Sequence, residues 1–228
     1  VRRCEVVDLR TRTMEPQAKP IFPALIIKAP YAAAMVQGLP HRSSGPAVLR
    51  KTVEIRGPRC YTDYRGPVAV FCSAAYDYAV EDHIVRWYVA STKPKTKAAS
   101  VLDDGYVRAW CQYTHAWKYR LIGFVALEDV SKRASLTQHQ ARASHVDATD
   151  FNVQWSDEDR IYLRVSALYQ YPRADGPKFS DVCTGCQAET PHNAAACHVN
   201  WQTVGLPSSV VPTIALTAQK DVKPWPRK

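Results

Sequence analysis

A short apolar run that leads directly into a helix start is the feature that most constrains the fold of this chain. Residues 24–27 are uninterrupted hydrophobic, as in a buried strand, and Pro30 follows three residues later. Proline is tolerated in the first turn of a helix, and Gly38 stands where a helix over residues 30–37 would end. A strand that passes so directly into a helix predicts a domain in which a sheet and helices share one core.

The rest of the chain alternates between strand-like and helix-like segments. Residues 51–56 have period two, which places Val53 and Ile55 towards the core and Thr52, Glu54 and Arg56 on the other side. Residues 76–90 carry apolar side chains at helical spacing, which predicts an amphipathic helix. Further strands are predicted at 68–72, 121–127, 161–169 and 199–204, with a β-prone aromatic segment at 106–113 and a loop at 39–49. These elements predict the α+β class.

One domain is sufficient for a chain of 228 residues. Residues 1–23 are polar and rich in proline, which predicts an irregular N-terminal arm. We expect the domain to span residues 24–212, with a turn-rich, cysteine-containing insertion at 172–198 and a C-terminal tail at 213–228.

The net charge of +9 is unevenly distributed along the chain. Residues 1–65 hold twelve Lys and Arg against five Asp and Glu, a net +7, which leaves +2 for the remainder. A basic segment of this kind favours a polyanionic partner, for which the phosphate backbone of RNA is the commonest candidate. Basic charge is also frequent in organellar proteins and in subunits of large assemblies, so a structural role stays open.

The apolar runs and the cysteines indicate in which cellular compartment the protein is expected. No run approaches the roughly 20 apolar residues that cross a bilayer, so we expect a soluble protein without a transmembrane segment. The start at Val1 has two readings: removal of an organellar transit peptide, which would suit a mitochondrial protein, or foreign residues before a true start at Met14. Seven cysteines, several of them far apart in apolar runs, indicate buried free thiols in a reducing, intracellular compartment.

A zinc site is the one cofactor that the sequence suggests. Cys183 and Cys186 stand at the spacing with which two thiolates share a tetrahedral zinc ion. His192 and Cys197 are the preferred closing pair, because Cys197 and His198 are adjacent and awkward to use together. The alternative is a loop with incidental thiols.

Four segments, taken in order, resemble an ASCH domain, a family of the PUA-like superfold. Residues 24–32 are similar to the family's opening strand and Pro-aromatic-Ala helix start, and Gly38 to the Gly that ends this helix. After a loop that is long for the family, residues 51–56 match its Lys-Thr-x-Glu-x-Arg strand, 64–70 resemble the strand after an Arg-Gly turn, and 121–125 resemble the apolar-apolar-Gly strand. The resemblance covers residues 24–130, with a weaker extension to about 212.

The resemblance implies a twisted β-barrel with flanking helices, a cleft beside the opening helix, and RNA or a nucleotide as ligand. Glu54 and Arg56 can present an acceptor and a forked donor to one ligand, or they can pair with each other as a structural ion pair. Lys51 would contact a phosphate, and Thr52 follows it directly.

Catalysis is a further possibility at the same positions. A desolvated Lys51 would have a lowered pKa and act as a base together with Glu54. Bacterial members that this chain resembles hydrolyse acylated cytidine with a Lys and a Thr three residues later, whereas Thr52 directly follows Lys51 and should point away from it. This departure counts against a nucleoside amidohydrolase or a ribonuclease.

Aromatic side chains supply the stacking surfaces that single-strand recognition needs. Tyr64, beside Arg65 at a predicted turn, is the preferred stacking residue, although most aromatic residues in a domain of this size belong to the core. The other candidates are Tyr61, Trp110, Tyr113 and Trp117.

Three functions remain open from the sequence. The first is a non-catalytic module that binds RNA or a nucleotide through Lys51, Thr52, Glu54, Arg56, Tyr64 and Arg65. The second is a structural accessory subunit of a large assembly, for example a mitochondrial one, that keeps the fold without binding a ligand. The third is an enzyme that uses Lys51 and Glu54.

Overall fold

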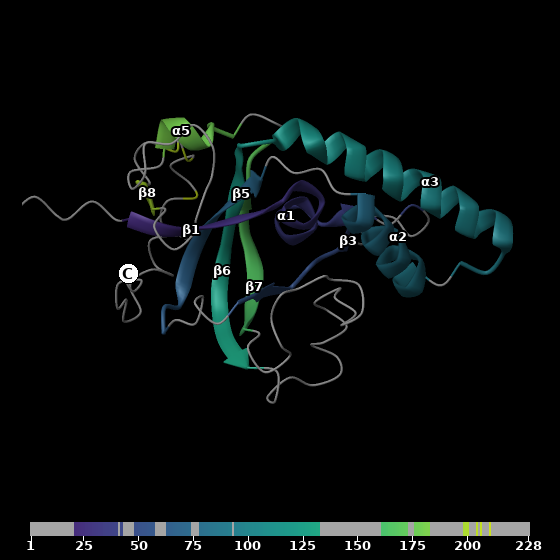
Figure 1. Ribbon diagram of the computed structural model, residues 1–228, viewed down its shortest axis with the longest axis horizontal. Helices are drawn as coiled ribbons and strands as arrows, with labels where there is room; N and C mark the ends of the chain where they lie inside the picture. Colours follow the sequence, from purple (N-terminus) through teal and green to yellow (C-terminus); the bar gives the residue numbers. More distant parts are fainter. Residues whose placement is uncertain are drawn as a thin grey trace, which may run out of the picture.

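A six-stranded mixed sheet organises the part of the chain that the structure describes. The computed structural model describes residues 21–40, 42, 48–57, 63–73, 78–92, 94–132, 161–172, 176–182, 198–200, 204, 206 and 210. The strands of the sheet, in its spatial order, are β4 (Val53–Arg56), β7 (Ile161–Gln170), β6 (Leu121–Lys132), β5 (Gly66–Ser73), β1 (Ile21–Lys28) and β8 (His198–Asn200). Neighbouring strands are antiparallel except β1 and β5, which run parallel (Figure 1).

Irregular pairing bends this sheet. The register shifts once in the β5–β6 ladder and twice in the β6–β7 ladder. An extra residue on one strand of a pair increases the local twist and bends that strand, and β6 curves towards its end in Figure 1. The sheet is therefore a curled half-barrel, and its class, α+β, is as predicted.

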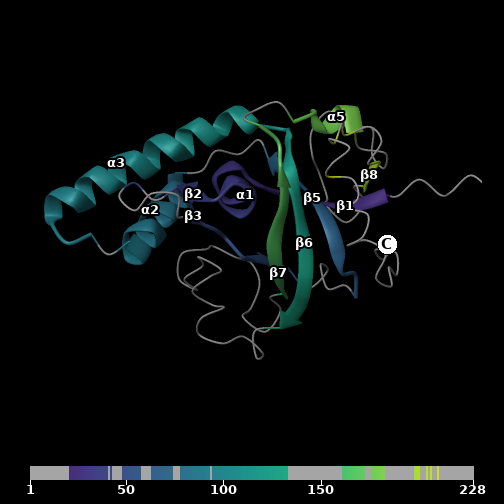
Figure 2. The same cartoon turned by 180° about the vertical axis from the view of Figure 1, so that it is seen from behind.

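Helix α1 (Ala29–Val36) lies between the sheet and two longer helices, α2 (Tyr78–Thr92) and α3 (Lys97–Thr114) (Figures 1 and 2). Every residue of α1 is buried, and most of its side chains are small and apolar, so the helix can approach the strands closely. It follows β1 without a break, with Pro30 in its first turn. Gly38 has a φ of +76°, a conformation that favours glycine. The predicted strand-to-helix unit is confirmed.

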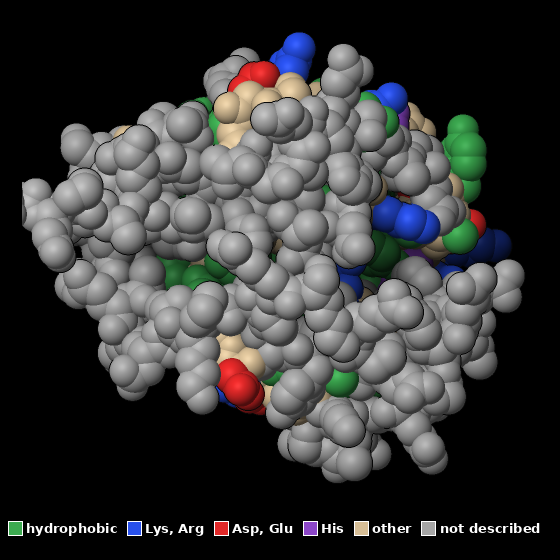
Figure 3. All heavy atoms as spheres, turned by 60° about the vertical axis from the view of Figure 1, so that its left-hand side comes forward, with side chains coloured by type: hydrophobic (Ala, Val, Ile, Leu, Met, Phe, Trp, Pro, Cys, Tyr) green, Lys and Arg blue, Asp and Glu red, His purple; other side chains and the backbone are tan. Residues whose placement is uncertain are grey.

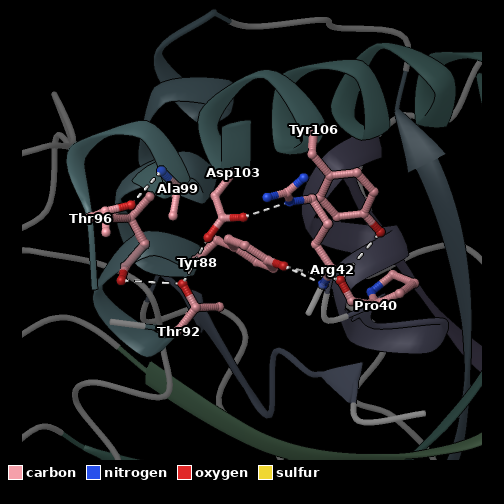
Figure 4. A network of polar contacts seen from close by, with 9 residues as sticks. Pro40, Arg42, Tyr88, Thr92, Thr96, Ala99, Asp103 and Tyr106 are labelled. Atoms are coloured by element: carbon pink, nitrogen blue, oxygen red, sulfur yellow. Dashed lines mark hydrogen bonds and ion pairs between the residues drawn. The ribbon is translucent and has the colours of Figure 1, made fainter. Parts of the chain in front are cut away.

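A short hairpin forms from the two ends of the predicted loop at 39–49. β2 (Leu39–Pro40) pairs antiparallel with β3 (Val48–Leu49). Arg42 fastens this region to the long helices: its main-chain N–H donates to the Tyr88 hydroxyl at 2.8 Å, and its Nε lies 3.0 Å from Asp103 Oδ1 (Figure 4). The hairpin that precedes Lys51 is thus tied to both α2 and α3.

The prediction of β structure at 106–113 is wrong, because these residues lie inside α3. Thr96 caps the helix, accepting a hydrogen bond from the Ala99 N–H at 3.1 Å. Asp103, Val107 and Cys111 are buried at a spacing of four residues, which is the period of a helix face packed on a core. This packing overrides the β-propensity of the aromatic residues between them.

Two strand ends differ from their predicted positions. β1 begins at Ile21, three residues before the expected start of the domain, because residues 21–23 pair antiparallel with β8. Strand β6 runs on to Lys132, past the predicted end at Leu127, because β7 continues to pair with it. The predicted helix at 76–90 and strand at 161–169 are confirmed as α2 and β7. No helix within the described ranges is long and apolar enough to cross a membrane.

The remaining short elements complete the core beside α3. A 3-10 turn, η2 (His115–Trp117), follows α3 directly, and helix α5 (Phe179–Val182) packs near β5. Trp117, Phe71 and Phe179 are fully buried there, and the rings of Phe71 and Phe179 meet edge to face with centroids 5.0 Å apart. The candidate stacking residue Trp117 is therefore a core residue.

Candidate functional site

The segment that carries the family-like motif enters β4 beside α1. The Lys51 N–H donates to the Ala34 carbonyl at 2.9 Å, which ties the segment to the last turn of α1. The register with β7 starts at Val53, and the Thr52 carbonyl just before it already accepts a hydrogen bond from the Val165 N–H of β7 at 2.8 Å. The Lys51 side chain is buried and Thr52 is exposed, so the two residues do not face the same surroundings.

One buried carboxylate, that of Glu54, holds two cations. Its Oε2 lies 3.2 Å from Lys51 Nζ and its Oε1 lies 3.1 Å from Arg56 Nε. The Lys51 ammonium also donates to the Val53 carbonyl. Two cations and one carboxylate leave a local charge of +1. The structural ion pair that the sequence allowed between Glu54 and Arg56 is present, with Lys51 as a third member.

Alternation along β4 predicted only part of this arrangement. Val53 is buried as expected, but Glu54 is buried as well and Ile55 is only half-buried. The polar side of the strand is therefore covered at Glu54. The side-chain exposures are 2% for Lys51, 10% for Glu54 and 21% for Arg56, so the cluster opens towards solvent at its Arg56 end.

Arg56 also joins the two ends of the curled sheet. Its Nη2 donates to the Ile26 carbonyl on β1 at 2.8 Å, although β7, β6 and β5 stand between β4 and β1 in the sheet. We call the gap between residues 24–28 of β1 and residues 53–56 of β4 the seam. Strand β8 pairs only with residues 21–23 of β1, so it does not reach this part of the strand. Arg56 spans the seam with its side chain.

Two residues that the sequence did not single out extend the cluster to α2. The Tyr31 hydroxyl on α1 lies 2.7 Å from His83 Nδ1 on α2. The Lys51 ammonium sits over the Tyr31 ring, 5.4 Å from its centroid. Both Tyr31 and His83 are buried, with 7% and 6% of their surface exposed. Contacts therefore run from His83 through Tyr31, Lys51 and Glu54 to Arg56.

A local signal for His83 was present in the sequence. His83 stands among Val80, Ile84 and Tyr88 on the apolar side of the predicted helix, and a histidine there needs a polar partner inside the protein. Tyr31 is part of the Pro-Tyr-Ala helix start, but nothing in the sequence pairs it with a residue 52 positions away.

Burial changes the ionisation of the cluster. It lowers the pKa of the Lys51 ammonium, and the charge of Arg56 acts in the same direction. The Glu54 carboxylate and its hydrogen bond to Lys51 oppose this effect but do not cancel it. The pKa of Lys51 is therefore shifted in the direction that a lysine base needs.

Tyr64 and Arg65 make contacts within their own turn and with β6. Tyr64 is 3% exposed and donates its hydroxyl proton to the Pro67 carbonyl at 2.6 Å, and burial raises its pKa. Arg65 donates to the Tyr64 carbonyl at 2.8 Å and lies 3.7 Å from Asp129. The Tyr64 ring therefore presents no open face for stacking. Among the other aromatic candidates Tyr113 is exposed and Trp110 is half-buried, both on α3, and Tyr61 lies outside the described residues.

The zinc prediction stays untested, because all four of its residues lie outside the described part of the chain: Cys183, Cys186, His192 and Cys197. Within the described ranges, no group of three or more His, Cys, Asp or Glu side chains is arranged to hold a metal ion. Cys72 and Cys111 are free and buried, and burial raises the pKa of Cys111 to about 12. These two thiols fit the buried, reduced state that the sequence suggested.

Figure 3 shows how the described basic side chains lie on one face of the molecule. On the face drawn in Figure 3, the coloured Lys and Arg side chains form separate patches next to hydrophobic atoms. Arg108 on α3 contacts three carboxylates at 2.6 to 2.9 Å, those of Glu81, Asp82 and Asp104, which neutralise it. Arg56 differs from Arg108 because, among the described residues, it has one carboxylate partner, Glu54, which it shares with Lys51.

No protein-family model matches this chain, and no curated protein sequence matches it.

Proposed function

We propose that the chain is an ASCH-like module of the PUA-like superfold and binds RNA or a nucleotide without catalysis. The observation that carries the proposal is the seam, where the Lys-Thr-x-Glu-x-Arg segment runs beside the opening helix and Arg56 lies half-buried across the gap between β4 and β1. The resemblance to the family implies a ligand cleft beside the opening helix, and the place of this segment beside α1 supports the proposal.

The charges and donors of the seam suit an anionic ligand. The local charge of +1 attracts a phosphate, and a guanidinium can offer two parallel hydrogen bonds to a phosphate or to a base edge. A ligand that engages Arg56 takes the place of the Ile26 carbonyl as acceptor. Glu54 remains neutralised by Lys51 while Arg56 turns to the ligand.

Binding of a short fluorescein-labelled single-stranded RNA, followed by anisotropy over a range of salt concentrations, tests this proposal. Arg56→Gln should weaken binding by about tenfold, the loss of one charge-assisted hydrogen bond, and lower the slope of log affinity against log salt by about 0.7. The matched control is Arg86→Gln, which removes the same charge from an exposed position on α2. Equal effects of the two substitutions would mean that only net charge matters and would remove the seam as the binding site.

Hydrolysis is a second candidate, favoured by the lowered pKa of Lys51 beside a carboxylate. In this reading Lys51 and Glu54 serve an amidohydrolase reaction on an N-acylated cytidine, with water as the nucleophile. The test is release of the carboxylic acid from such a nucleoside, with Lys51→Ala as the inactive control. Turnover that persists in Lys51→Ala would exclude this assignment.

The accessory-subunit alternative has its own support, because Glu54 already satisfies both cations of the cluster. On this view the three residues only close the seam. Native mass measurement from cells that produce the chain separates the alternatives: a stable protein assembly without nucleic acid would favour the structural role.

A further inference from the structure

The contact between Lys51 and Tyr31 makes α2 part of the proposed site. His83 belongs to α2, Tyr31 to α1, and Lys51 to the segment before β4, and the chain brings them together over 52 residues. The Tyr31 and His83 rings meet nearly perpendicular, at 78°, with centroids 6.0 Å apart. In this arrangement His83 meets the hydroxyl of Tyr31, while the face of the Tyr31 ring is turned to Lys51.

The chemistry of these three groups couples them. In one tautomer of neutral histidine, Nδ1 carries a lone pair and accepts the hydroxyl proton of Tyr31. A phenol that donates a hydrogen bond holds more electron density in its ring, and the negative face of the ring attracts a cation. Inside the protein such attractions are stronger than in water. His83 therefore acts on the Lys51 ammonium through Tyr31, without touching it.

The next contacts carry this effect to the open end of the cluster. Lys51 holds Oε2 of Glu54, and Glu54 presents its other oxygen to Arg56 at the seam. A change in the charge of Lys51 changes how strongly Glu54 attracts Arg56. It therefore also changes how readily the Arg56 guanidinium can turn to a ligand. The position of α2 is in this way connected to a site on the far side of α1.

We propose that His83 is a positioning residue of this site, because it orients and polarises Tyr31. Tyr31 in turn stabilises the charged form of Lys51. Lys51 holds Glu54, so that Arg56 can exchange the Ile26 carbonyl for an anionic ligand. The part that concerns ligand affinity rests on the function proposed above. The part that concerns Lys51 does not, and it is measured without a ligand.

The first measurement follows the ionisation of Lys51 directly. The protein is labelled with lysine carrying ¹³C at Cε, the Lys51 signal is identified by its loss in Lys51→Met, and its chemical shift is recorded against pH. Tyr31→Phe keeps the ring but removes the hydroxyl, and His83→Leu removes the acceptor. Both should move the titration of Lys51 to lower pH, because the ammonium loses stabilisation.

His83→Asn is the matched control, because an Asn side-chain oxygen can occupy nearly the position of Nδ1 and accept the same hydrogen bond. It should restore the wild-type titration of Lys51. Tyr31→Phe remains informative if His83→Leu does not fold. A Lys51 titration that stays the same or moves to higher pH in Tyr31→Phe would show that the pair only fills the core, and would overturn the proposal.

The second measurement uses the labelled RNA described above. Tyr31→Phe and His83→Leu should bind it about threefold to tenfold more weakly, and His83→Asn as tightly as wild type. If wild type does not bind the RNA while the Lys51 titration responds as expected, the proposed function fails and the coupling through Tyr31 stands. If wild type binds the RNA and none of these substitutions changes either readout, the role of His83 is excluded and the proposed function is untouched.

Discussion

The guanidinium of Arg56 donates a hydrogen bond to the main-chain carbonyl of Ile26 at 2.8 Å, across the open side of the curled sheet. The two residues lie on strands that three other strands separate in the sheet. A side chain thus connects strands whose backbones are not paired. Because Glu54 holds both this guanidinium and the Lys51 ammonium, the ion pairs contribute both to the shape of the sheet and to the proposed site.

Arg56→Lys should lower the free energy of unfolding by about 1–2 kcal/mol. A lysine keeps the charge but its compact ammonium cannot reach Glu54 and the Ile26 carbonyl in the same forked geometry. Urea unfolding followed by circular dichroism measures the change. Arg86→Lys, at an exposed position on α2, serves as control and should stay within about 0.5 kcal/mol of wild type. A similar result for both variants would mean that Arg56 does not brace the seam.

The lowered pKa of Lys51 predicts a pH dependence of stability. In the unfolded chain the ammonium returns to its ordinary value of 10.5, so between the folded-state pKa and 10.5 the unfolded state binds more protons. The contribution of Lys51 to the free energy of unfolding should therefore rise with pH through this window and fall again as the pH is lowered.

The measurement is the difference in unfolding free energy between wild type and Lys51→Met as a function of pH. Methionine fills a similar volume and does not titrate, so the ionisation of other groups cancels in the difference. The difference should move in favour of wild type as the pH approaches 10.5 from below. A difference that is flat, or that moves in favour of Lys51→Met, would contradict the lowered pKa.

Tyr64→Phe tests whether Tyr64 belongs to the core or to a binding surface. The substitution removes the hydrogen bond to the Pro67 carbonyl, and leaves that buried oxygen without the phenol, so it should cost about 1 kcal/mol of stability. Affinity for RNA should not change. Tyr113→Phe on the exposed side of α3 is the control and should alter neither quantity. A loss of RNA affinity at unchanged stability would return Tyr64 to the ligand site.

The sequence predicted elements whose pattern is local. The run from Ala24 into Pro30 fixes a strand and a helix through adjacent residues, and the apolar spacing of α2 is visible within fifteen positions. Helix α3 was missed for two reasons. Its buried stripe includes the polar residues Asp103 and Thr114, so the apolar residues alone do not show a helical period, and the aromatic residues between them favour a strand.

The site was predictable only along β4. Lys51, Glu54 and Arg56 are close in sequence and the Lys-Thr-x-Glu-x-Arg motif groups them, but strand alternation points Lys51 away from Glu54 and did not predict their ion pair. The Arg56 contact to Ile26 spans 30 positions and the Tyr31 contact to His83 spans 52, and both depend on how the sheet curls and on where α2 packs. No pattern within one element carries that information: the place of His83 on the apolar side of α2 indicates that it needs a polar partner, but not that the partner is Tyr31.

Arg42 and Asp103 should be coupled energetically. Their ion pair at 3.0 Å joins the β2–β3 hairpin to α3, with the Asp103 side chain buried and the Arg42 side chain 39% exposed. Solvent screening at Arg42 limits the expected coupling to about 0.5–1 kcal/mol. A double-mutant cycle with Arg42→Met and Asp103→Asn, read by urea unfolding, measures it. Additive effects of the two substitutions would mean that the pair does not fasten the hairpin.

Two glycine-to-alanine substitutions should change the stability of the fold in opposite directions. A Cβ at Gly123 on β6 would lie 2.1 Å from the Tyr169 carbonyl oxygen and 2.6 Å from Val36 Cγ1, so either β7 or α1 must move. Overpacking of this kind costs about 2–3 kcal/mol. A Cβ at Gly105 on α3 would meet no atom within 4 Å, and alanine in a helix interior is favoured over glycine by about 0.5–1 kcal/mol.

The pair is matched because both variants add one methyl group to the same chain. Thermal unfolding should show a lower midpoint for Gly123→Ala and a higher one for Gly105→Ala, relative to wild type. Val36, which a Cβ at Gly123 would meet, belongs to the same helix as Tyr31, so a displacement of α1 at Gly123 would also move the Tyr31 ring relative to Lys51. Gly123→Ala should therefore also disturb the Lys51 titration, and Gly105→Ala should leave it unchanged. A Gly123→Ala protein as stable as wild type would mean that α1 does not pack as tightly on β6 as these distances require.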